Sequence, residues 1–400
     1  MTPAQKGIQK EPAVIGLMLL SAFAVMGAII LTPSLPAIAT FYHIKTGTAQ
    51  LTVTLFLLGY ALGQLVYGPI ADRYGRKPAL YIGIVVATLG SLLSIFSEPL
   101  HSFAFLLAGR VLEALGASAG LVISYTIIND FYKKQRRKIT GMLMLAFAIV
   151  PGIAVLLGGL IAQYVDWVYC FYFLLIYGLV LIIPIWQLPE TLLKKDPHAL
   201  KVKNILAGYL NELNNKQLLG FAICSGLSSG CIYVFGAEGP FIGIHLLGIQ
   251  PVTYGLLGLI PYVGTLIGSL LVVRLTNLNA ILVLMIAFAL ESLAAIIMLA
   301  LFSLHIVSLF SLLGPMVFLC MGHPILAGTA AALGMSIALN KAFGSAILNF
   351  TSMSVAMLVT FILSIIHIKS PIILPIMFIF ALIVMIITYL TLKLSRVELL

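Results

Sequence analysis

Charged residues are scarce in this chain of 400 residues. Asp, Glu, Lys and Arg together make up 8% of it, whereas hydrophobic residues make up 62% and the mean hydropathy is +1.16. A soluble protein carries roughly 25% charged residues, so this chain has too few to cover a globular surface with solvated groups. The composition therefore favours a membrane protein with several spans over a soluble protein with a very apolar core.

Cysteines and the common catalytic patterns are also sparse. The four cysteines, Cys170, Cys224, Cys231 and Cys320, lie in apolar stretches without C-x-x-C spacing, so they predict neither a zinc site nor a disulfide framework. The sequence has no H-E-x-x-H or G-x-S-x-G motif and no paired catalytic carboxylates. We therefore expect no enzyme activity, no metal and no organic cofactor. A sensor without transport activity is a further alternative, and we would expect it to carry an added soluble domain.

Long apolar runs are abundant. A bilayer core about 30 Å thick needs about 20 apolar residues per helix, and twelve runs of that length lie between polar breaks. They cover residues 13–38, 49–71, 79–97, 102–129, 139–163, 167–187, 217–241, 252–274, 280–302, 306–334, 343–366 and 371–393. A single long polar break divides them into six and six, which is typical of a transporter built from two similar halves. We therefore expect an all-α polytopic membrane protein with an N-terminal half over 1–187, a linker over 188–216 and a C-terminal half over 217–400.

Basic residues are unevenly distributed among the connecting segments. If the N-terminus is cytoplasmic, nineteen of the 22 Lys and Arg residues fall in cytoplasmic segments, Lys45 and Lys369 fall on the opposite side, and Arg110 lies within a helix. This is the positive-inside pattern, and it predicts that both termini are cytoplasmic. The net charge of +10 is then a topology signal, and we expect no nucleic-acid partner.

Two charged residues lie deep in the fourth apolar run. Arg110 and Glu113 are three residues apart and so share a helix face, about 12 Å and 16 Å from its outer end. Ionisable groups at such depth usually mark a functional site. Two interpretations remain open: an intrahelical ion pair that neutralises itself, or a cavity-facing pair in which Glu113 takes up a proton and Arg110 tunes its affinity for it.

Three further ionisable residues are weaker candidates for a cavity or its rim. Glu291 lies near the middle of the ninth run without a visible partner, so it fits either function or helix packing. His323 lies well inside the tenth run, where a hydrogen-bonded core histidine is the more common case. Glu238 ends the seventh run, and this position favours an interfacial, solvated carboxylate.

The turn between the second and third runs reads GPIADRYGRKPAL and holds four charges in six positions. It resembles the G-x-x-a-D-r-x-G-r-[rk] signature of the major facilitator superfamily, and the matching residues are Gly68, Asp72, Arg73, Gly75, Arg76 and Lys77. Three further segments resemble motifs of the same family in the expected order. They are GRVLEALGASAG in the fourth run, VPGIAVLLGGLIAQYVDW in the fifth run with Pro151, Gly152, Gly158 and Gly159, and LPETL at 188–192.

Within this family the chain is most similar to the proton-coupled drug efflux branch of the Bcr/CflA type, in SLPAIA, AEGPFI and GTAAALGM. The resemblance implies a monomeric antiporter of the bacterial inner membrane that exports small lipophilic or cationic compounds, such as a drug, metabolite or siderophore. The proton gradient would drive it, and two halves would rock about a cavity lined mostly by the first, fourth, seventh and tenth runs. The alternative is a proton-coupled importer or facilitator of a small metabolite with the same fold.

The chain departs from that pattern where the proton site is expected. Such exporters commonly carry an acid in the first run, where this chain has Ile29, Ile30 and Leu31, and usually have Gln in place of Glu113. One interpretation is that the membrane carboxylate has moved from the first run to the fourth. The fifth-run motif also lacks its second proline, since Val155 stands there, which weakens the antiporter interpretation.

Asp72 and its neighbours are predicted to form a cytoplasmic gate. A bare carboxylate at the C-terminal end of a helix is unfavourable, so Asp72 needs donors, and the resemblance implies that the N-terminus of the eleventh helix supplies them. Arg76 is expected to bridge to Asp130 at the inner end of the fourth run. These contacts would form when the inner side is closed and break when it opens.

Overall fold

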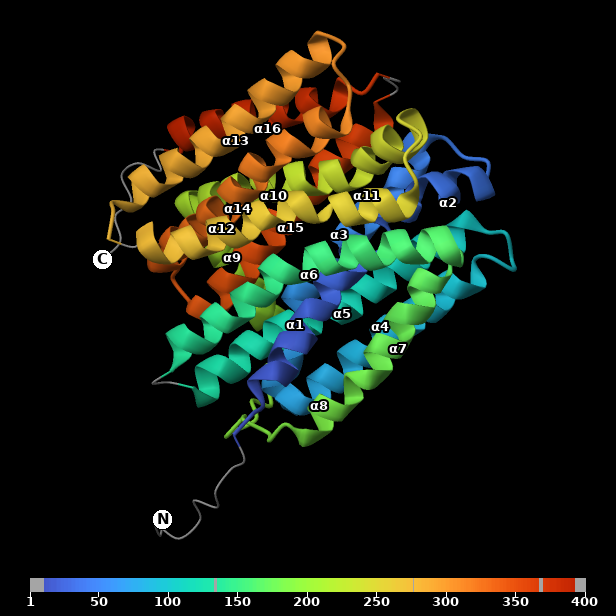
Figure 1. Cartoon of the computed structure of the whole chain (residues 1–400). Coiled ribbons are helices and arrows are strands. Elements are labelled where there is room, and N and C mark those ends of the chain that lie inside the picture. The colour runs from blue at the N-terminus through green and yellow to red at the C-terminus, as the bar shows by residue number, and fades with distance from the viewer. Residues whose placement is uncertain (1–10, 133–134, 276, 367–369, 393–400) are drawn as a thin grey trace, which may run out of the picture.

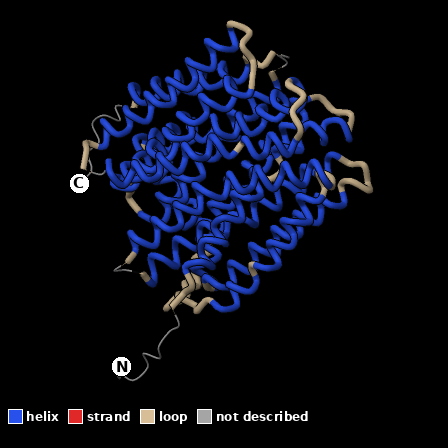
Figure 2. The backbone as a smooth tube through the Cα atoms, in the orientation of Figure 1, coloured by secondary structure: helices blue, strands red, loops and turns tan. Residues whose placement is uncertain are grey.

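The computed structural model describes residues 11–132, 135–275, 277–366 and 370–392, and within these ranges the chain forms helices and loops but no strand (Figure 2). The N-terminal half contains α1 (Val14–Ile29), η2 (Thr32–Ser34), α2 (Leu35–Phe41), α3 (Thr46–Tyr74), α4 (Arg76–Phe96), α5 (Phe103–Phe131), α6 (Arg136–Tyr164), α7 (Tyr169–Val180) and α8 (Ile182–Gln187). The linker contains α9 (Val202–Leu213). The C-terminal half contains α10 (Lys216–Pro240), η3 (Phe241–Leu246), α11 (Pro251–Leu257), α12 (Leu259–Leu275), α13 (Ala280–Ser303), α14 (Leu309–Ile337), α15 (Lys341–Ile365) and α16 (Ile373–Thr391).

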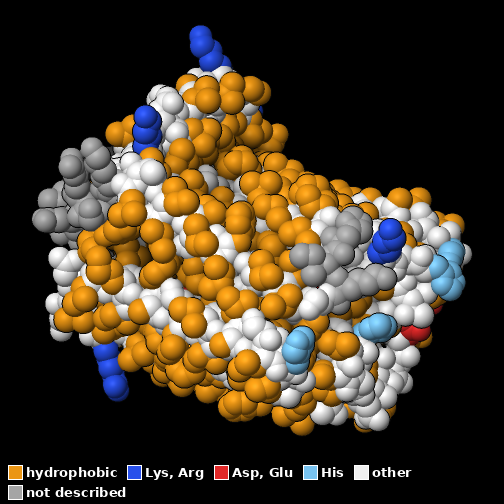
Figure 3. All heavy atoms as spheres, turned by 90° about the horizontal axis from the view of Figure 1, so that it is seen from above, with side chains coloured by type: hydrophobic (Ala, Val, Ile, Leu, Met, Phe, Trp, Pro, Cys, Tyr) orange, Lys and Arg blue, Asp and Glu red, His pale blue; other side chains and the backbone are white. Residues whose placement is uncertain are grey.

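The twelve predicted spans are confirmed. Among the described residues, twelve helical stretches are long and apolar enough to cross a bilayer, and each coincides with one of the twelve apolar runs. Large apolar side chains such as Val85, Ile176 and Phe380 are exposed on the outside of the bundle, where lipid rather than water surrounds a membrane protein. Figure 3 shows this apolar surface on one face, with the blue Lys and Arg side chains at its margins.

Several spans are broken into shorter helices at proline. The first span bends because Pro33 and Pro36 lie at the start of η2 and α2, after α1 has ended. The seventh span continues through Pro240 into η3, a π-helical segment, so that its last turns are wider than those of a regular α-helix. These irregular segments all lie at the same end of the bundle.

The two halves lie along opposite sides of the bundle, with the N-terminal half in blue to green and the C-terminal half in yellow to red (Figure 1). We call the end that carries residues 188–216 the linker end, and the other the opposite end. At the opposite end the halves pack closely, because η2 and α2 contact α10, α11 and η3, and α6 contacts α11. α3 and α15 also pack against each other across the interface.

The linker contains a helix that the sequence analysis treated only as a polar segment. α9 packs against α15 and α10 of the C-terminal half. The Tyr209 hydroxyl donates a hydrogen bond of 2.6 Å to the Leu65 carbonyl oxygen of α3 in the N-terminal half. Burial and the nearby Asp72 carboxylate raise the pKa of Tyr209 to about 12, so the phenol remains a donor at neutral pH. The linker helix therefore contacts both halves.

Candidate functional site

A central cavity of about 270 Å³ lies between the two halves. Its wall is mostly apolar and aromatic, with a few polar side chains that point inward, which is the usual composition of a site for a small molecule. The aromatic members are Phe56, Tyr60, Phe147, Tyr233 and Tyr262, and the polar members are Gln64, Ser229, Thr265, Ser269, His323 and Asn349. Met144 of α6, which is 40% exposed, also lines the cavity.

The expectation about which helices line the cavity is only half right. Spans 1, 4, 7 and 10 contribute Ala24, Leu121, Ser229 and His323, among others. Spans 2, 5, 8 and 11 contribute an equal share of the lining, so the prediction that the first set dominates is wrong. The physical reason is that α3, α6, α12 and α15 lie at the interface between the halves and form the side walls.

Arg110 and Glu113 form a buried ion pair on α5. The Arg110 Nη1 atom lies 3.1 Å from Glu113 Oε2, and the two side chains are 0% and 1% exposed. Arg110 also donates from Nη2 to the Gly27 carbonyl oxygen at 2.9 Å, and its guanidinium lies 4.1 Å from the centre of the Phe56 ring. The charge of Arg110 is therefore met by a carboxylate, a carbonyl and an aromatic face, which is what a fully buried cation requires.

Close helix packing holds this pair in place. A Cβ at Gly90 of α4 would lie 2.2 Å from the Glu113 backbone nitrogen, and a Cβ at Gly27 of α1 would lie 2.7 Å from Glu113 Oε1. Only residues without a side chain permit α1 and α4 to approach α5 so closely. Glu113 is thereby enclosed by three helices.

The expectation that the pair faces the cavity is wrong for this structure. Of the described residues, neither Arg110 nor Glu113 lines the cavity, whereas Phe56 both lines it and stacks on Arg110. The Phe56 ring thus separates the ion pair from the cavity. Behind this aromatic face the two charges compensate each other away from water. The role of the pair in proton coupling stays a prediction.

The predicted contact between Arg76 and Asp130 is confirmed. Arg76 Nε lies 3.0 Å from Asp130 Oδ2, and Arg76 Nη1 lies 2.5 Å from Asp72 Oδ1. Burial within this cluster leaves Arg76 itself 7% exposed, while Asp72 remains half exposed. Arg76 thus joins the C-terminal ends of α3 and α5 within the N-terminal half, so this contact forms without the two halves meeting at the linker end, contrary to the expectation that it breaks when the inner side opens.

Other residues of the turn have simpler surroundings. Gly75 adopts φ +118, a conformation that favours glycine, and ends α3 so that α4 can begin at the next residue. Lys77 donates from Nζ to the Trp186 carbonyl oxygen at 2.7 Å. Arg73 lies in the last turn of α3, where a cation is favourable. A Cβ at Gly68 would meet no atom within 4 Å, so the packing here does not require glycine at that position.

Glu190 is a member of this cluster that the sequence analysis did not single out. Its Oε1 and Oε2 atoms accept hydrogen bonds of 3.0 and 3.2 Å from the backbone N–H groups of Arg76 and Lys77. The carboxylate therefore caps the N-terminus of α4, where a negative charge is stabilising. Glu190 belongs to the LPETL segment at 188–192, whose resemblance to a family motif was the signal available in the sequence.

The contact between Asp72 and the eleventh helix was predicted for the state that is closed at the linker end, and it stays a prediction, because Asp72 is paired with Arg76 in this arrangement. α15 begins after Asn340, whose side chain accepts from the backbone of Ala342 and Phe343. The carboxylate of Glu212 on α9 accepts from the backbone N–H of Leu339 at 3.3 Å and of Asn340 at 2.5 Å. The linker helix therefore holds the position that Asp72 was expected to occupy, and Asp72 satisfies its charge with Arg76.

The fifth-run motif lies at the interface between the halves. Pro151 lines the cavity, and a Cβ at Gly152 would lie 3.1 Å from Leu259. Gly158 faces the Ile30 carbonyl of α1, and a Cβ at Gly159 would lie 2.5 Å from the Pro251 carbonyl of α11. The two adjacent glycines thus let α6 approach both halves at the opposite end.

Glu238 is not the solvated carboxylate that its position in the sequence favoured. It is half buried, and its Oε2 atom accepts a hydrogen bond of 2.5 Å from Gln50 Nε2. Gln50 belongs to α3 and Glu238 to α10, so the bond crosses between the halves at the opposite end. Packing of α2 against η3 covers this region and removes it from full solvent contact.

Glu291 and His323 are brought together by a residue that the sequence analysis passed over. Ser228 Oγ donates to Glu291 Oε1 at 2.5 Å and lies 2.9 Å from His323 Nδ1. The three residues belong to α10, α13 and α14 and lie far apart in the chain. A serine in a membrane span is too common for the sequence alone to have singled it out.

Comparisons with known proteins agree with this architecture. The family model described as Major Facilitator Superfamily matches residues 17–361. The xylose transporter XylE from E. coli, in a partially occluded inward open conformation, is similar in fold with a TM-score of 0.73, 14% identity, and coverage of 93% of this chain and 96% of that one. At this identity the likeness concerns the fold alone.

Three curated relatives are similar over the larger part of the chain. The bicyclomycin resistance protein homolog of Haemophilus influenzae is 28% identical over 279 residues, which is 69% of each chain. The multidrug resistance protein D of Escherichia coli is 27% identical over 63% of each chain, and the chloramphenicol resistance protein of Pseudomonas aeruginosa is 29% identical over 60% of this chain and 57% of its own. The aligned segments thus span 57% to 69% of these relatives' own length.

The twelve spans in two halves, the cavity between them and the charged turn around Arg76 occur together with a family match that covers most of the chain. This chain belongs to the major facilitator superfamily.

Proposed function

We propose that this protein exports small drug-like molecules across the bacterial inner membrane in exchange for protons. The observation that carries the proposal is the central cavity, whose aromatic and apolar wall with few polar groups suits lipophilic or cationic compounds. The names of the bicyclomycin, multidrug and chloramphenicol resistance relatives support drugs as the substrate class. The positive-inside pattern supports a cytoplasmic linker end and cytoplasmic termini.

The cavity would serve substrate by alternating access. With the linker end in the cytoplasm, the present arrangement would be the one that receives substrate from inside, since the halves pack closely at the opposite end. The bonds Gln50–Glu238 and Thr54–Thr360, at 2.5 and 3.1 Å, join the halves at the opposite end. They would break as the cavity opens outward, and the charged cluster around Arg76 would then find partners across the closing linker end.

Glu113 and Arg110 would couple this motion to protons. Protonation of Glu113 removes the charge that compensates Arg110, and an unpaired buried cation is costly. Phe56 links the pair to the cavity, because one face of its ring contacts Arg110 and the side chain also lines the wall. A substrate that displaces the ring would weaken the hold on Arg110 and thereby change the affinity of Glu113 for its proton.

A resistance profile tests the substrate class. A bacterial strain that lacks its own exporters is grown with chloramphenicol or bicyclomycin, with and without this protein, and we expect higher resistance to at least one of them with the protein. In everted membrane vesicles, an imposed pH gradient that is acidic inside should drive uptake of the same drug, and a protonophore should abolish it. Uptake driven by the reverse gradient would instead identify an importer, and uptake that survives both the protonophore and Glu113→Gln would contradict proton exchange at Glu113.

A further inference from the structure

Three helices of the C-terminal half meet at a buried polar cluster formed by Ser228, Glu291 and His323. Ser228 and Glu291 are 0% and 1% exposed. Ser228 Oγ donates to Glu291 Oε1 at 2.5 Å, so its single hydrogen is used. His323 Nδ1, 2.9 Å away, must then be the donor to Ser228 Oγ. The hydrogen bonds therefore run in one direction, from the imidazole through the hydroxyl to the carboxylate.

The cluster reaches water at only one of its ends. His323 is half buried and lines the central cavity, so its second ring nitrogen, Nε2, is the one that remains to exchange with cavity water. Glu291 lies at the other end, against α14, where a Cβ at Gly322 would lie 2.8 Å from Glu291 Cγ. Its second oxygen, Oε2, is buried and has no hydrogen-bond partner among the described residues.

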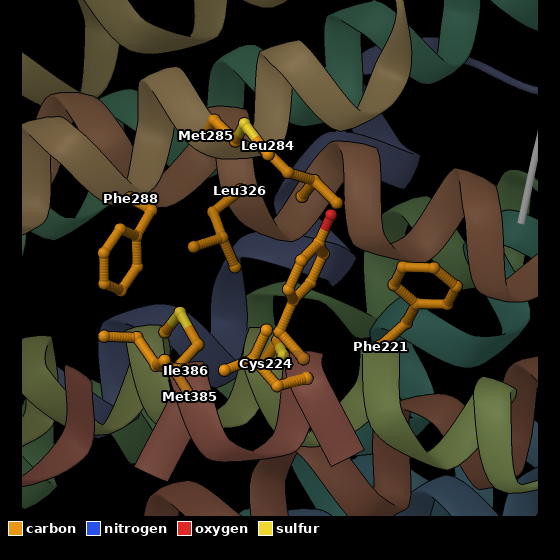
Figure 4. Close-up of a pocket in the computed structure, with 10 residues that line it drawn as sticks. Phe221, Cys224, Leu284, Met285, Phe288, Leu326, Met385 and Ile386 are labelled. Carbon is orange, nitrogen blue, oxygen red and sulfur yellow. The ribbon is translucent and has the colours of Figure 1, made fainter. Parts of the chain in front are cut away.

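An apolar pocket of about 210 Å³ lies next to the cluster on its linker-end side, and Figure 4 shows the side chains that line it. Each residue of the cluster has a neighbour that lines this pocket, one helical turn closer to the linker end. Cys224 lies four residues from Ser228, and Phe288 lies three residues from Glu291. Leu326 lies three residues from His323. The pocket opens at the surface of the bundle, where Met285 and Leu390 are exposed to lipid, so apolar side chains and lipid border Glu291 on this side. Water and protons therefore have no polar route to Glu291 from this side.

Glu291 has no cation to balance its charge within the part of the chain that the structure describes, where the ion pairs involve only Arg76 and Arg110. The other titratable groups around it are the Cys224 and Cys231 thiols of α10, Cys320 of α14, and Tyr389 of α16, which lines the pocket. None of these supplies a positive charge. An ionised carboxylate in such surroundings is costly, whereas a neutral carboxylic acid costs much less.

We propose that Glu291 is a second proton-binding site of this transporter and that His323 and Ser228 deliver its proton from the central cavity. The inference rests on the proposed proton-driven export and assigns one proton to each half, at Glu113 and at Glu291. The two sites belong to different halves on opposite sides of the same cavity, and of the two only Glu113 has a cationic partner among the described residues.

The transfer moves one proton and leaves the relay groups chemically unchanged. His323 Nε2 accepts a proton from cavity water while its Nδ1–H proton passes to Ser228 Oγ. Ser228 passes its own hydroxyl proton to Glu291 Oε1, to which it donates its hydrogen bond. The imidazole ends neutral with its proton on Nε2, and exchange with cavity water restores the proton to Nδ1 before the next transfer.

Infrared difference spectroscopy of the reconstituted protein tests the site without any transported substrate. Between mildly acid and alkaline pH we expect the wild type to lose carboxylic C=O absorption, and Glu291→Gln to lack one component of that loss. Ser228→Ala should retain the component but reach its final amplitude more slowly after a pH jump, because the relay is cut. Gln can accept the same hydrogen bond from Ser228, so the variant keeps this contact. If Glu291 does not change protonation across this pH range, the loss of C=O absorption in Glu291→Gln will equal that of the wild type. That result overturns the proposal.

A stoichiometry measurement tests whether this proton is transported. The proteoliposomes are held at zero membrane potential, and chloramphenicol serves as the neutral probe. For each proton exchanged per drug molecule, the limiting ratio of drug concentrations across the membrane changes by about a factor of ten per pH unit. We expect a limiting ratio of about 100 per unit for the wild type and about 10 for Glu291→Gln. An unchanged ratio in the variant overturns the proposal. If the wild type does not transport chloramphenicol, the proposed function fails for this drug, and the infrared result still decides whether Glu291 binds a proton.

Discussion

The two halves of the molecule each bury a carboxylate beside the central cavity, and they satisfy it in different ways. Glu113 lies 3.1 Å from a guanidinium that a carbonyl and an aromatic ring also contact. Glu291 accepts a hydrogen bond from a serine hydroxyl, which in turn contacts a histidine. The first arrangement is neutral when the acid is ionised and the second when it is protonated. One fold with two similar halves thus holds two acids with opposite preferences.

Because of this difference, we expect the substitution with the largest effect on the free energy of unfolding to lie in the N-terminal half. Arg110→Met leaves Glu113 buried without its cation, and loss of one partner of a buried ion pair costs about 3–5 kcal/mol. The free energy of unfolding in mixed detergent micelles measures the effect. The double variant Arg110→Met/Glu113→Gln should recover most of the loss, because no unpaired charge remains. A double variant as unstable as Arg110→Met would show that the packing of Arg110, and not its charge, matters.

A smaller loss is expected when the polar link in the C-terminal half is removed. Ser228→Ala leaves Glu291 and His323 without their shared partner, and an unsatisfied buried group costs about 1–3 kcal/mol. Ser225→Ala is the matched control, because this serine lies one turn away on α10 and receives a weaker bond of 3.3 Å from Ser352. Equal losses of unfolding free energy in the two variants would contradict the expectation that Ser228 contributes more to stability than Ser225.

The linker helix permits a test of how far the halves depend on each other. Tyr209→Phe removes the bond to the Leu65 carbonyl in the N-terminal half and should cost about 0.5–1.5 kcal/mol. Protease cleavage within 188–216 should become faster, because α9 then binds only the C-terminal half. If the Tyr209→Phe variant is cleaved at the wild-type rate, α9 is held by α15 and α10 alone.

The smallest stability effect is expected at the charged turn. Asp72 is half exposed, and exposed ion pairs contribute about 0–1 kcal/mol. Asp72→Asn should therefore change the free energy of unfolding by no more than about 1 kcal/mol, and we expect it to slow drug efflux if the turn acts as a gate. Arg76→Ala should have the larger effect of the two, because Arg76 is buried and contacts both Asp72 and Asp130. Wild-type efflux in both variants would end the gate interpretation.

Local features of the sequence were sufficient for the fold and for some contacts. The twelve apolar runs predicted the twelve spans, and Pro33 and Pro36 are a local signal for the bend after α1. The contact of Arg76 with Asp130 followed from the charge of the two residues and their shared depth. The surroundings of Glu238 were not predicted, because its bond with Gln50 depends on the relative position of the halves.

The sequence by itself determined how many times the chain crosses the membrane and which residues lie at membrane depth, because the thickness of the bilayer sets the length of an apolar helix. Only the tertiary structure decided what those residues contact. It placed Phe56 between Glu113 and the cavity, brought Glu212 rather than Asp72 to the start of α15, and joined Glu291 to His323 through Ser228. The reason is that each of these contacts joins helices distant in the chain, and helix packing, which hydropathy does not encode, fixes their rotation and separation.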